Sequence, residues 1–264
     1  MAPENKVPAL EVHDLTVAFD RKPVLWNIDL TIPQGKIVGI VGPNGAGKST
    51  LIKAVMGILS LSSGYTRLFD QSINDVRHRI SYVPQRESVD WDFPASVMDV
   101  VLMGRYSKIG LFKRPRKADR DAALDCLKKV GMEAFANRQI SQLSGGQQQR
   151  TFLARALAQH ADIYFMDEPF AGVDAATEKT IINLLRDMTN AGKTVIVVHH
   201  DLQSVKNYFD WVIMLNTRLV ASGPTEETFT QENLHETYGG KLTLLADVAD
   251  LIRRENYPQR EKKL

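Results

Sequence analysis

Apolar and polar residues alternate in two stretches near the start of the chain, Leu10 to Phe19 and Val24 to Ile32. A repeat of two residues is typical of a strand with one buried face. Turn-forming residues separate the stretches, so we predict a pair of antiparallel strands. Two other segments, Lys36 to Val41 and Thr194 to Val198, are almost uninterrupted runs of apolar residues. Such short runs favour strands buried on both faces.

The pattern then alternates between strands and helices, as in a parallel sheet. A helix is predicted over Lys48 to Leu59, a strand over Ile163 to Met166, and a helix over Thr177 to Ala191. The strand at Thr194 to Val198 follows, and Val212 to Ser222 resembles a hairpin. We therefore expect a parallel sheet with helices on both faces.

Residues 80 to 145 have a helical pattern instead, which we interpret as an insert. Its clearest helix places Ala123, Leu124, Leu127 and Val130 on one face. The basic run 113–117 is interpreted as a solvated loop, with contact to anionic lipid as the alternative.

The predicted fold is therefore α/β, a parallel sheet with an antiparallel β subdomain and a helical subdomain. The domain is expected to cover residues 9–240, with the helical subdomain inserted at about 86–160. A tail, 241–264, has apolar residues at helical spacing and then becomes rich in Lys and Arg.

Composition narrows the class of protein. The chain has 264 residues and a formal net charge of +2, too small to favour nucleic acid as a partner. The single cysteine, Cys126, excludes an internal disulfide, and we expect it to be a small core residue. No apolar run approaches the roughly 18 residues of a membrane-spanning helix, and Met1 to Pro8 does not resemble a signal peptide. We expect a cytoplasmic protein that reaches any membrane through another chain.

The segment after the strand at Lys36 to Val41 matches the phosphate-binding pattern G-x-x-x-x-G-K-[ST]. Glycines permit the backbone angles that turn successive N–H groups toward phosphates, and the helix that follows directs its positive end to the same place. Lys48 adds a charge between the β- and γ-phosphates, and the Ser49 hydroxyl suits Mg²⁺. The expected ATP-binding residues are Gly42, Asn44, Gly45, Gly47, Lys48, Ser49 and Thr50.

The strand at Ile163 to Met166 runs into two acidic residues, Asp167 and Glu168. In parallel sheets, ligands bind beyond the carboxyl ends of strands. We expect Asp167 to hold Mg²⁺ or its waters. Neighbours on a strand face opposite sides, so Glu168 is predicted to face the attacking water and to act as general base. Two solvated acids before Pro169 are the alternative.

A second anion-binding helix start is predicted at Leu143 to Gln147, before a helix over Gln148 to Gln159. One bound ATP does not need two such cradles from the same chain. We therefore expect Ser144, Gly145, Gly146 and Gln147 to close over ATP that is held by another copy.

With these motifs, residues 9 to 240 resemble the ATP-binding subunits of the ABC family. Gln85, after Tyr82-Val83-Pro84, matches its Q-loop glutamine, and His200, before Asp201, matches its switch histidine. The resemblance implies a fold of the P-loop NTPase (RecA-like) type and a head-to-tail pair that encloses two ATP molecules. It also implies that Gln85 senses Mg²⁺ and the membrane partner, and that His200 contacts the γ-phosphate.

Other assignments also follow from the resemblance. Phe19 takes the place of the aromatic residue that stacks on adenine, and Asp174 is the D-loop aspartate, although the residues before it depart from the family's commoner Ser-Ala-Leu. Lys48, Gln85, Glu168 and His200 form the predicted catalytic set. His199 and His200 are expected to face opposite sides of a strand end, and a metal site at this pair is the rival interpretation.

The stretches from Ser88 to Tyr106 and from Pro169 to Asp174 are similar to the ABC subgroup that imports manganese, zinc or iron. This resemblance implies a homodimer on the inner face of the cell membrane, an integral-membrane permease and, indirectly, a secreted metal-binding protein. Trp91 and Phe93 are predicted to anchor the permease, with a local cap on the helical insert as the alternative. The rival functions are an ABC exporter subunit, a soluble ABC ATPase acting on nucleic acid, the ribosome or cofactor assembly, and a scaffold without turnover.

Overall fold

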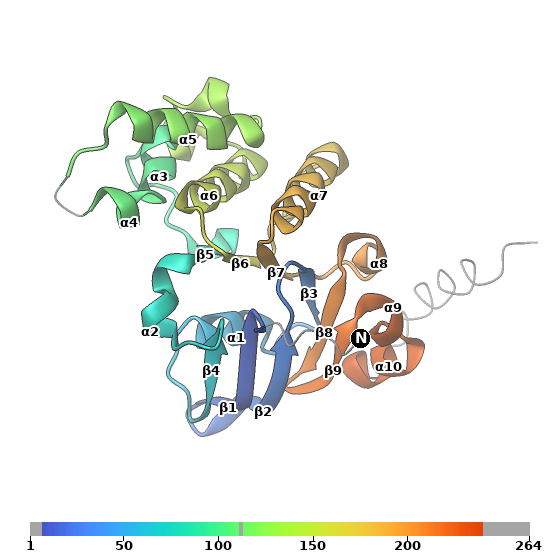
Figure 1. The fold of residues 1–264 in the computed structure, drawn as a ribbon. Coiled ribbons are helices and arrows are strands. Elements are labelled where there is room, and N and C mark those ends of the chain that lie inside the picture. Colours follow the sequence, from blue (N-terminus) through green and yellow to red (C-terminus); the bar gives the residue numbers. More distant parts are fainter. Residues whose placement is uncertain (1–6, 111–112, 240–264) are drawn as a thin grey trace, which may run out of the picture. The chain divides into compact units, whose positions relative to one another are not determined.

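The computed structural model describes residues 7–110 and 113–239, which fall into two compact units (Figure 1). The first unit comprises the described residues up to Glu11, Thr31–Ile37 and Thr66–Val198. The second comprises Val12–Leu30, Val38–Tyr65 and the described residues from His199 onward. The predicted tail, 241–264, lies outside the described residues.

The first unit is built on three parallel strands, β5 (Ile80–Val83), β6 (Ile163–Asp167) and β7 (Thr194–Val198). β6 lies between β5 and β7 and pairs parallel with both of them. All residues of β6 and β7 are buried, as the apolar runs predicted. β5 corrects the prediction that the helical insert begins at residue 80. Its four residues are too few to show a period, and one of them is Ser81, whose hydroxyl donates to the Ala156 carbonyl.

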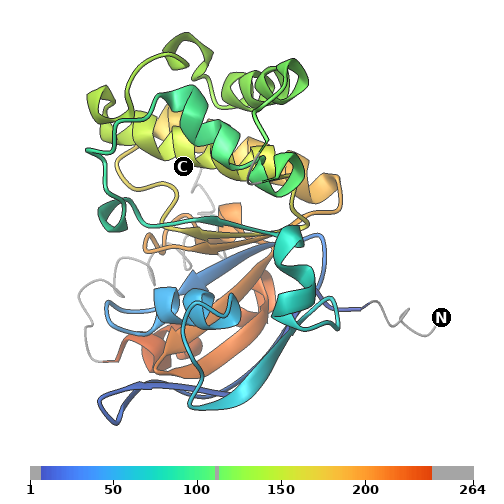
Figure 2. The same cartoon turned by 90° about the vertical axis from the view of Figure 1, so that its left-hand side faces the viewer.

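Helices make up most of the rest of the first unit. They are α2 (Ile73–Val76), α3 (Val97–Met103), α4 (Tyr106–Ile109), α5 (Lys117–Lys129), α6 (Gly145–Gln159) and α7 (Ala175–Asn190), with short 3₁₀ turns at Arg77–Arg79, Arg86–Ser88, Glu133–Phe135 and Ile140–Gln142. α3 and α5 pack on α6, and Figure 2 shows the green helices gathered in one cluster. Gly104, at the end of α3, allows the backbones of α3 and α6 to approach closely, because a Cβ there would lie 2.1 Å from the Arg155 carbonyl oxygen.

The starts of two helices differ from the prediction because side chains cap them. α6 begins at Gly145, three residues before the predicted start, because Ser144 forms a reciprocal capping box with Gln147. α7 begins at Ala175 rather than Thr177, because the Asp174 carboxylate accepts the Thr177 N–H at 2.9 Å. In α5, Ala123 and Leu127 of the predicted face are buried, and Cys126 is buried as a core residue. Leu124 of that face is only half-buried, and Val130 is buried but follows the end of the helix.

The second unit contains β3 (Ile37–Val41) from Val38 onward, β8 (Trp211–Asn216) and β9 (Arg218–Pro224). β3 pairs parallel with β8, and β8 forms an antiparallel hairpin with β9 through Thr217, whose φ is 61°. The predicted strand and hairpin are both confirmed. The helices of this unit are α1 (Lys48–Val55), α8 (Val205–Tyr208), α9 (Thr225–Thr228) and α10 (Gln231–Tyr238).

The helix predicted to run to Leu59, α1, ends at Val55 instead. Gly57 adopts a φ of 67°, and its N–H donates to the Ala54 carbonyl at 3.0 Å. The Ile58 N–H donates to the Lys53 carbonyl at 2.9 Å. The two hydrogen bonds form a Schellman motif, which ends the helix.

A small sheet, with strand order β2-β1-β4, joins β1 (Leu10–Phe19), β2 (Lys22–Ile32) and β4 (Ser63–Leu68). β1 and β2 form the predicted antiparallel pair. Asp14 and Asn27 have positive φ values of 48° and 51° and interrupt the alternation in each strand. Apolar residues on both sides of each interruption are therefore buried, namely Leu10, Val12, Leu15 and Val17 in β1 and Leu25, Ile28, Leu30 and Ile32 in β2. β4 was not predicted, because most of its residues are exposed and lack an apolar alternation.

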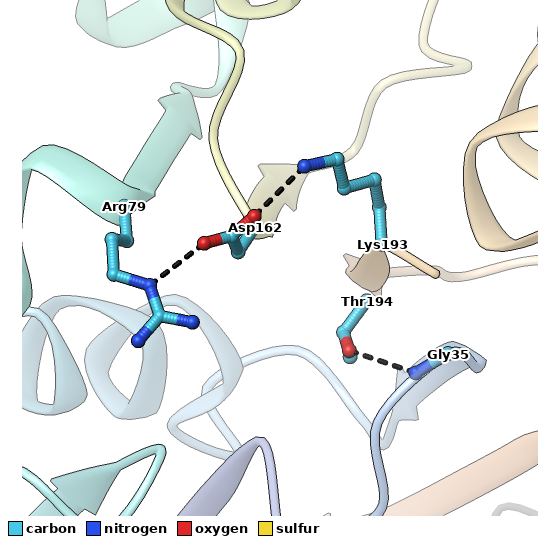
Figure 3. A network of polar contacts seen from close by, with 5 residues as sticks. All are labelled: Gly35, Arg79, Asp162, Lys193 and Thr194. Atoms are coloured by element: carbon cyan, nitrogen blue, oxygen red, sulfur yellow. Dashed lines mark hydrogen bonds and ion pairs between the residues drawn. The ribbon is translucent and has the colours of Figure 1, made fainter. Parts of the chain in front are cut away.

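Figure 3 shows the polar network at the start of the strands in the first unit. The Asp162 carboxylate, just before β6, accepts from Arg79 Nε at 2.7 Å and from Lys193 Nζ at 2.8 Å. Thr194, the first residue of β7, accepts the Gly35 N–H at 3.0 Å. The network fixes the amino ends of β5, β6 and β7. Their opposite, carboxyl ends carry the acidic residues discussed below.

Within the described residues, we find no helix that is long and apolar enough to cross a bilayer.

Candidate functional site

The loop between β3 and α1 depends on glycine at three positions. Gly45 and Gly47 have φ values of 82° and 94°, which side chains disfavour. At Gly42 a Cβ would lie 2.0 Å from the Leu215 carbonyl oxygen, and at Gly47 it would lie 2.6 Å from Leu25 Cδ2. The loop is therefore packed tightly on β8 at Gly42 and on β2 at Gly47, and at Gly45 the positive φ alone disfavours a side chain.

Lys48 directs its ammonium group back into this loop. Its side chain is buried, and Nζ donates to the carbonyl oxygens of Gly42 at 2.8 Å and Pro43 at 2.9 Å. α1 begins after Gly47 with no side-chain cap and no acidic residue in its first turn. The helix start and the lysine together make the loop electropositive, as an anion-binding loop requires. Asn44 and Gly45 are exposed, and Ser49 and Thr50 are half-buried.

Other residues of the second unit form hydrogen bonds that hold the loop between β3 and α1, and these bonds were not predicted from the sequence. The Thr217 N–H donates to the Ala46 carbonyl at 3.0 Å, and the Trp26 N–H donates to the Thr217 carbonyl at 2.8 Å. Arg218 lies over the exposed Trp26 ring at 4.6 Å. At the end of α10, the Gly42 N–H donates to the Tyr238 phenol, whose pKa burial raises above its ordinary value. No sequence pattern marks these contacts, because they join residues far apart in the chain.

Phe19, at the end of β1 in the same unit, is 49% exposed. A large aromatic ring left in solvent at a strand end has a free face for stacking.

The paired histidines just after β7 differ sharply. His199 is buried, its backbone N–H donates to the Ile40 carbonyl, and its Nε2 lies 2.7 Å from the Ser204 hydroxyl. Burial lowers the pKa of His199 to about 4, so the ring is neutral at pH 7. His200 is exposed. The expectation that the two side chains face opposite sides of the strand end is not met, because β7 ends at Val198 and the two ring centroids lie only 5.9 Å apart. The histidines differ in burial, and His200 is the one accessible to a ligand. Among the described residues, no group of three or more His, Cys, Asp or Glu side chains could hold a metal ion.

The two acidic residues lie at the carboxyl end of β6, in the first unit. Asp167 is 1% exposed and pairs with Val198 of β7. Burial, assisted by the negative charge of Asp167, raises the pKa of Tyr82 to about 12. Glu168 corrects our argument from strand alternation, because β6 ends at Asp167 and Glu168 has a φ of 51°. The left-handed backbone at Glu168, rather than the pleat of the strand, sets its direction.

The start of α6 presents Ser144, which is exposed and accepts the Gln147 N–H at 3.4 Å. Gln147 Oε1 accepts the Ser144 N–H at 2.9 Å in return. A Cβ on Gly146 would lie 3.3 Å from the Gly172 carbonyl oxygen, so the turn before Asp174 packs against this helix start. Hydrogen bonds from the Thr177 backbone and hydroxyl hold the pKa of Asp174 below its usual range. The predicted signature and D-loop residues are thus neighbours.

Gln85 is connected to the same helix through the residue that follows it. Arg86 Nε donates to Gln148 Oε1 at 3.1 Å, and Gln148 Nε2 donates to the Ile140 carbonyl at 3.2 Å. A Cβ on Gly145 would lie only 3.0 Å from Arg86 Cζ. Arg86 and Gln148 were not predicted, and they tie the Gln85 segment to the first turn of α6.

Trp91 and Phe93 do not share an environment. The Trp91 indole N–H donates to the Arg86 carbonyl at 2.9 Å, and its ring meets Phe152 edge-on at 5.1 Å between centroids. Trp91 is half-buried and has these local contacts, as the alternative of a local cap on the helical insert supposes, and its role in docking stays a prediction. Phe93 is 54% exposed.

The predicted site residues divide between the units. Within the second unit, the structure places Phe19, the 42–50 segment and His200. Within the first unit it places Gln85, the 144–147 segment, Asp167, Glu168 and Asp174. The two helix starts predicted to bind anions thus lie in different units, one at Gly47 and one at Ser144.

Comparison with known proteins identifies the class. Residues 25–171 match the family model described as ABC transporter. The chain belongs to the ABC transporter family and is an ABC transporter ATPase, so it binds ATP. The family resemblance and the predicted fold class are confirmed.

The chain is 62% identical over 238 residues to the manganese transport system ATP-binding protein MntB of Bacillus subtilis (strain 168), covering 90% of this chain and 95% of that protein. It is 56% identical over 235 residues to the zinc transport system ATP-binding protein TroB of Treponema pallidum (strain Nichols), covering 89% of this chain and 88% of that protein. These similarities make the chain a subunit of a transport system.

Solved structures agree with the fold. CbiO1 from Clostridium perfringens, part of the ABC transporter complex CbiONQ, superposes with a TM-score of 0.72 at 29% identity, covering 93% of this chain and 99% of that chain. A nucleotide-free ATP-binding cassette from an ABC transporter gives a TM-score of 0.73 at 22% identity, covering 87% of this chain and 94% of that chain. The latter likeness supports the fold alone.

Proposed function

We propose that this chain is the ATP-hydrolysing subunit of an ABC importer for divalent metal ions, namely manganese, zinc or iron. The observation that carries this proposal is the similarity to MntB and TroB along 90% and 89% of the chain. The similarity extends over the segments that resembled metal importers, Ser88 to Tyr106 and Pro169 to Asp174.

ATP would be held by the phosphate loop, with Lys48 at the β- and γ-phosphates and Phe19 stacked on adenine. The glycine positions that no Cβ could occupy and the buried Lys48 ammonium support this assignment. Ser49, Gln85 and Asp167 supply hydroxyl, amide and carboxylate oxygens, the hard ligands that Mg²⁺ prefers. Mg²⁺ bound by these residues would neutralise charge that develops on the β- and γ-phosphate oxygens.

Hydrolysis would depend on Glu168, which positions a water and accepts its proton as the water attacks the γ-phosphate. His200, being exposed, would contact the γ-phosphate. Ser144, Gly145, Gly146 and Gln147 of a second copy would complete the site through the start of α6, with Asp174 beside them. The support for action in trans is that each chain carries two anion-binding helix starts.

The partners would be a second copy of this chain and an integral-membrane permease, with a secreted metal-binding protein acting indirectly. The chain would then lie on the inner face of the cell membrane. Phe93 is the better candidate anchor for the permease, because its side chain is exposed and Trp91 is occupied by Phe152 and Arg86.

Reconstitution tests the function. The chain and its permease are placed in liposomes, and uptake of radioactive Mn²⁺, Zn²⁺ and Fe²⁺ is measured with ATP on the side of this chain. We expect ATP-dependent movement of at least one metal toward this chain. The matched control, Glu168→Gln, should move none. Movement away from this chain would establish an exporter, and ATP hydrolysis without metal movement would contradict the proposal.

A further inference from the structure

The first unit contains a cavity of about 270 Å³ that is separate from every residue assigned to ATP. Its lining residues come from the end of α5, from α6 and from α7. Three kinds of side chain line it. Two are cationic, Lys129 and Arg150, two carry hydroxyl groups, Thr177 and Thr180, and the apolar ones are Val130, Ala176, Ile181 and Leu184.

The cations of this cavity have no acidic partner. Within residues 7–110 and 113–239, no carboxylate forms an ion pair with either Lys129 or Arg150. Arg150 Nη1 reaches the Val130 carbonyl at 3.5 Å, which complements the negative end of α5. Arg150 Nε is buried and has no hydrogen-bond partner in the described structure. A buried N–H donor of a charged group lowers the stability of the fold unless it forms a hydrogen bond with an acceptor.

The neighbouring polar groups do not supply that acceptor. The Thr177 hydroxyl donates to Asp174 Oδ2 at 3.1 Å, and the Thr180 hydroxyl donates to the Ala176 carbonyl at 3.0 Å. The Asp174 carboxylate is held by the Thr177 N–H and hydroxyl. The cavity thus combines unused positive charge on one side with an apolar wall on the other.

We propose that this cavity binds a small organic anion, in which a carboxylate or phosphate group meets Arg150 and Lys129 and an apolar body contacts Ile181 and Leu184. A guanidinium suits an oxyanion, because its N–H groups match the spacing of two oxygens. The volume is close to the lower limit of small-molecule pockets, roughly 300 Å³, so the ligand is small. Such a ligand would connect α6, which begins at the signature, with α7, which begins at the D-loop.

Methyl NMR on the full chain tests the proposal, with isoleucine labelled and hexanoate as probe. Hexanoate should shift the Ile181 methyl signal saturably and leave Ile28, in the other unit, unshifted. Inorganic phosphate separates a bare oxyanion from an organic one and should bind more weakly. Hexanol, which lacks the charge, should cause no saturable shift.

Substitutions of Arg150 and Lys129 test whether these two cations bind the carboxylate of hexanoate. Arg150→Gln should weaken hexanoate binding by about tenfold or more, as expected for a charge-assisted hydrogen bond, and Lys129→Gln should weaken it as well. Lys128→Gln is the matched control, since Lys128 pairs with Asp125 and does not line the cavity. Because Lys129 is exposed, its variant should fold normally even if Arg150→Gln does not.

Unchanged affinity in Lys129→Gln, or equal binding of hexanol and hexanoate, would overturn the site. Phosphate binding as tight as hexanoate would overturn the organic part of the proposal. ATP hydrolysis is not a readout in this experiment, so its result does not depend on the proposed transport function.

Discussion

Adjacent residues at the ends of β6 and β7 take up opposite tasks because their backbones leave the strand. His199 packs against Phe209 and binds Ser204, and His200 remains in solvent. Asp167 is buried within the strand, and Glu168 turns away with a left-handed backbone. In each pair one member is buried and its neighbour is more exposed to solvent.

The pKa of His199 predicts acid sensitivity. The buried ring has a pKa of about 4, below the ordinary value of 6.5, so it binds its proton more weakly in the folded chain than in the unfolded chain. Stability is therefore retained above pH 6.5 and lost as the pH falls from there toward 4. When the pH falls from 7 to 5, protonation of His199 should lower the free energy of unfolding by about 2 kcal/mol.

Urea unfolding of the wild type and of His199→Gln at both pH values measures this effect. The variant, which cannot titrate there, should lose about 2 kcal/mol less than the wild type over that interval. Equal losses would show that His199 does not cause the acid sensitivity.

Glu168 gives the second prediction at this scale. Glu168→Gln keeps the size of the side chain but removes the proton acceptor, so ATP turnover should fall by about 100-fold or more. ATP binding should persist. Phosphate release and fluorescent-nucleotide titration measure the two quantities, with exposed Glu236→Gln as control. Turnover at the wild-type rate would refute the general-base assignment.

Among the elements, α6 is connected to the Gln85 segment by Arg86 and Gln148. A double-mutant cycle with Arg86→Ala and Gln148→Ala should give a coupling energy of about 1 kcal/mol in unfolding free energy. Lys128→Ala combined with Gln148→Ala is the control and should be additive. Additivity of the Arg86 pair would mean that the connection carries no energy.

α10 reaches the phosphate loop through Tyr238. Tyr238→Phe removes the hydroxyl that accepts the Gly42 N–H, so we expect ATP to bind about fivefold more weakly, the equivalent of one hydrogen bond. Fluorescent-nucleotide titration measures this affinity, with Tyr65→Phe on the exposed face of β4 as control. If both variants bind ATP as tightly as the wild type, Tyr238 does not position the loop.

The elements also show what the sequence could predict. β7 was found because it is an uninterrupted apolar run, and the β8–β9 hairpin because two apolar runs flank the polar residues 216–218. β4 was missed because it is mostly exposed, and β5 because it is short and contains Ser81. Helix starts at Gly145 and Ala175 were placed late because capping by Ser144 and Asp174 decides them.

For the whole molecule, the sequence predicted the fold class and the family, because the motifs have fixed residue types at fixed spacing. It could not predict the hydrogen bonds that support those motifs, such as the bond from Thr217 N–H to the Ala46 carbonyl or from Arg86 Nε to Gln148 Oε1. These bonds join residues far apart in the chain, and no local sequence pattern indicates them. The roles of the site residues stay predictions. They depend on the proposal that two copies share each ATP.

Sedimentation of Glu168→Gln tests that central proposal most directly. The chain has a mass of 29.6 kDa, and with Mg²⁺ and ATP the variant should sediment at twice this mass. Adding Ser144→Arg should return it to the monomer while fluorescent ATP still binds, because only the partner's contact is blocked. A dimer that survives Ser144→Arg, or no ATP-dependent dimer in Glu168→Gln alone, would contradict the account.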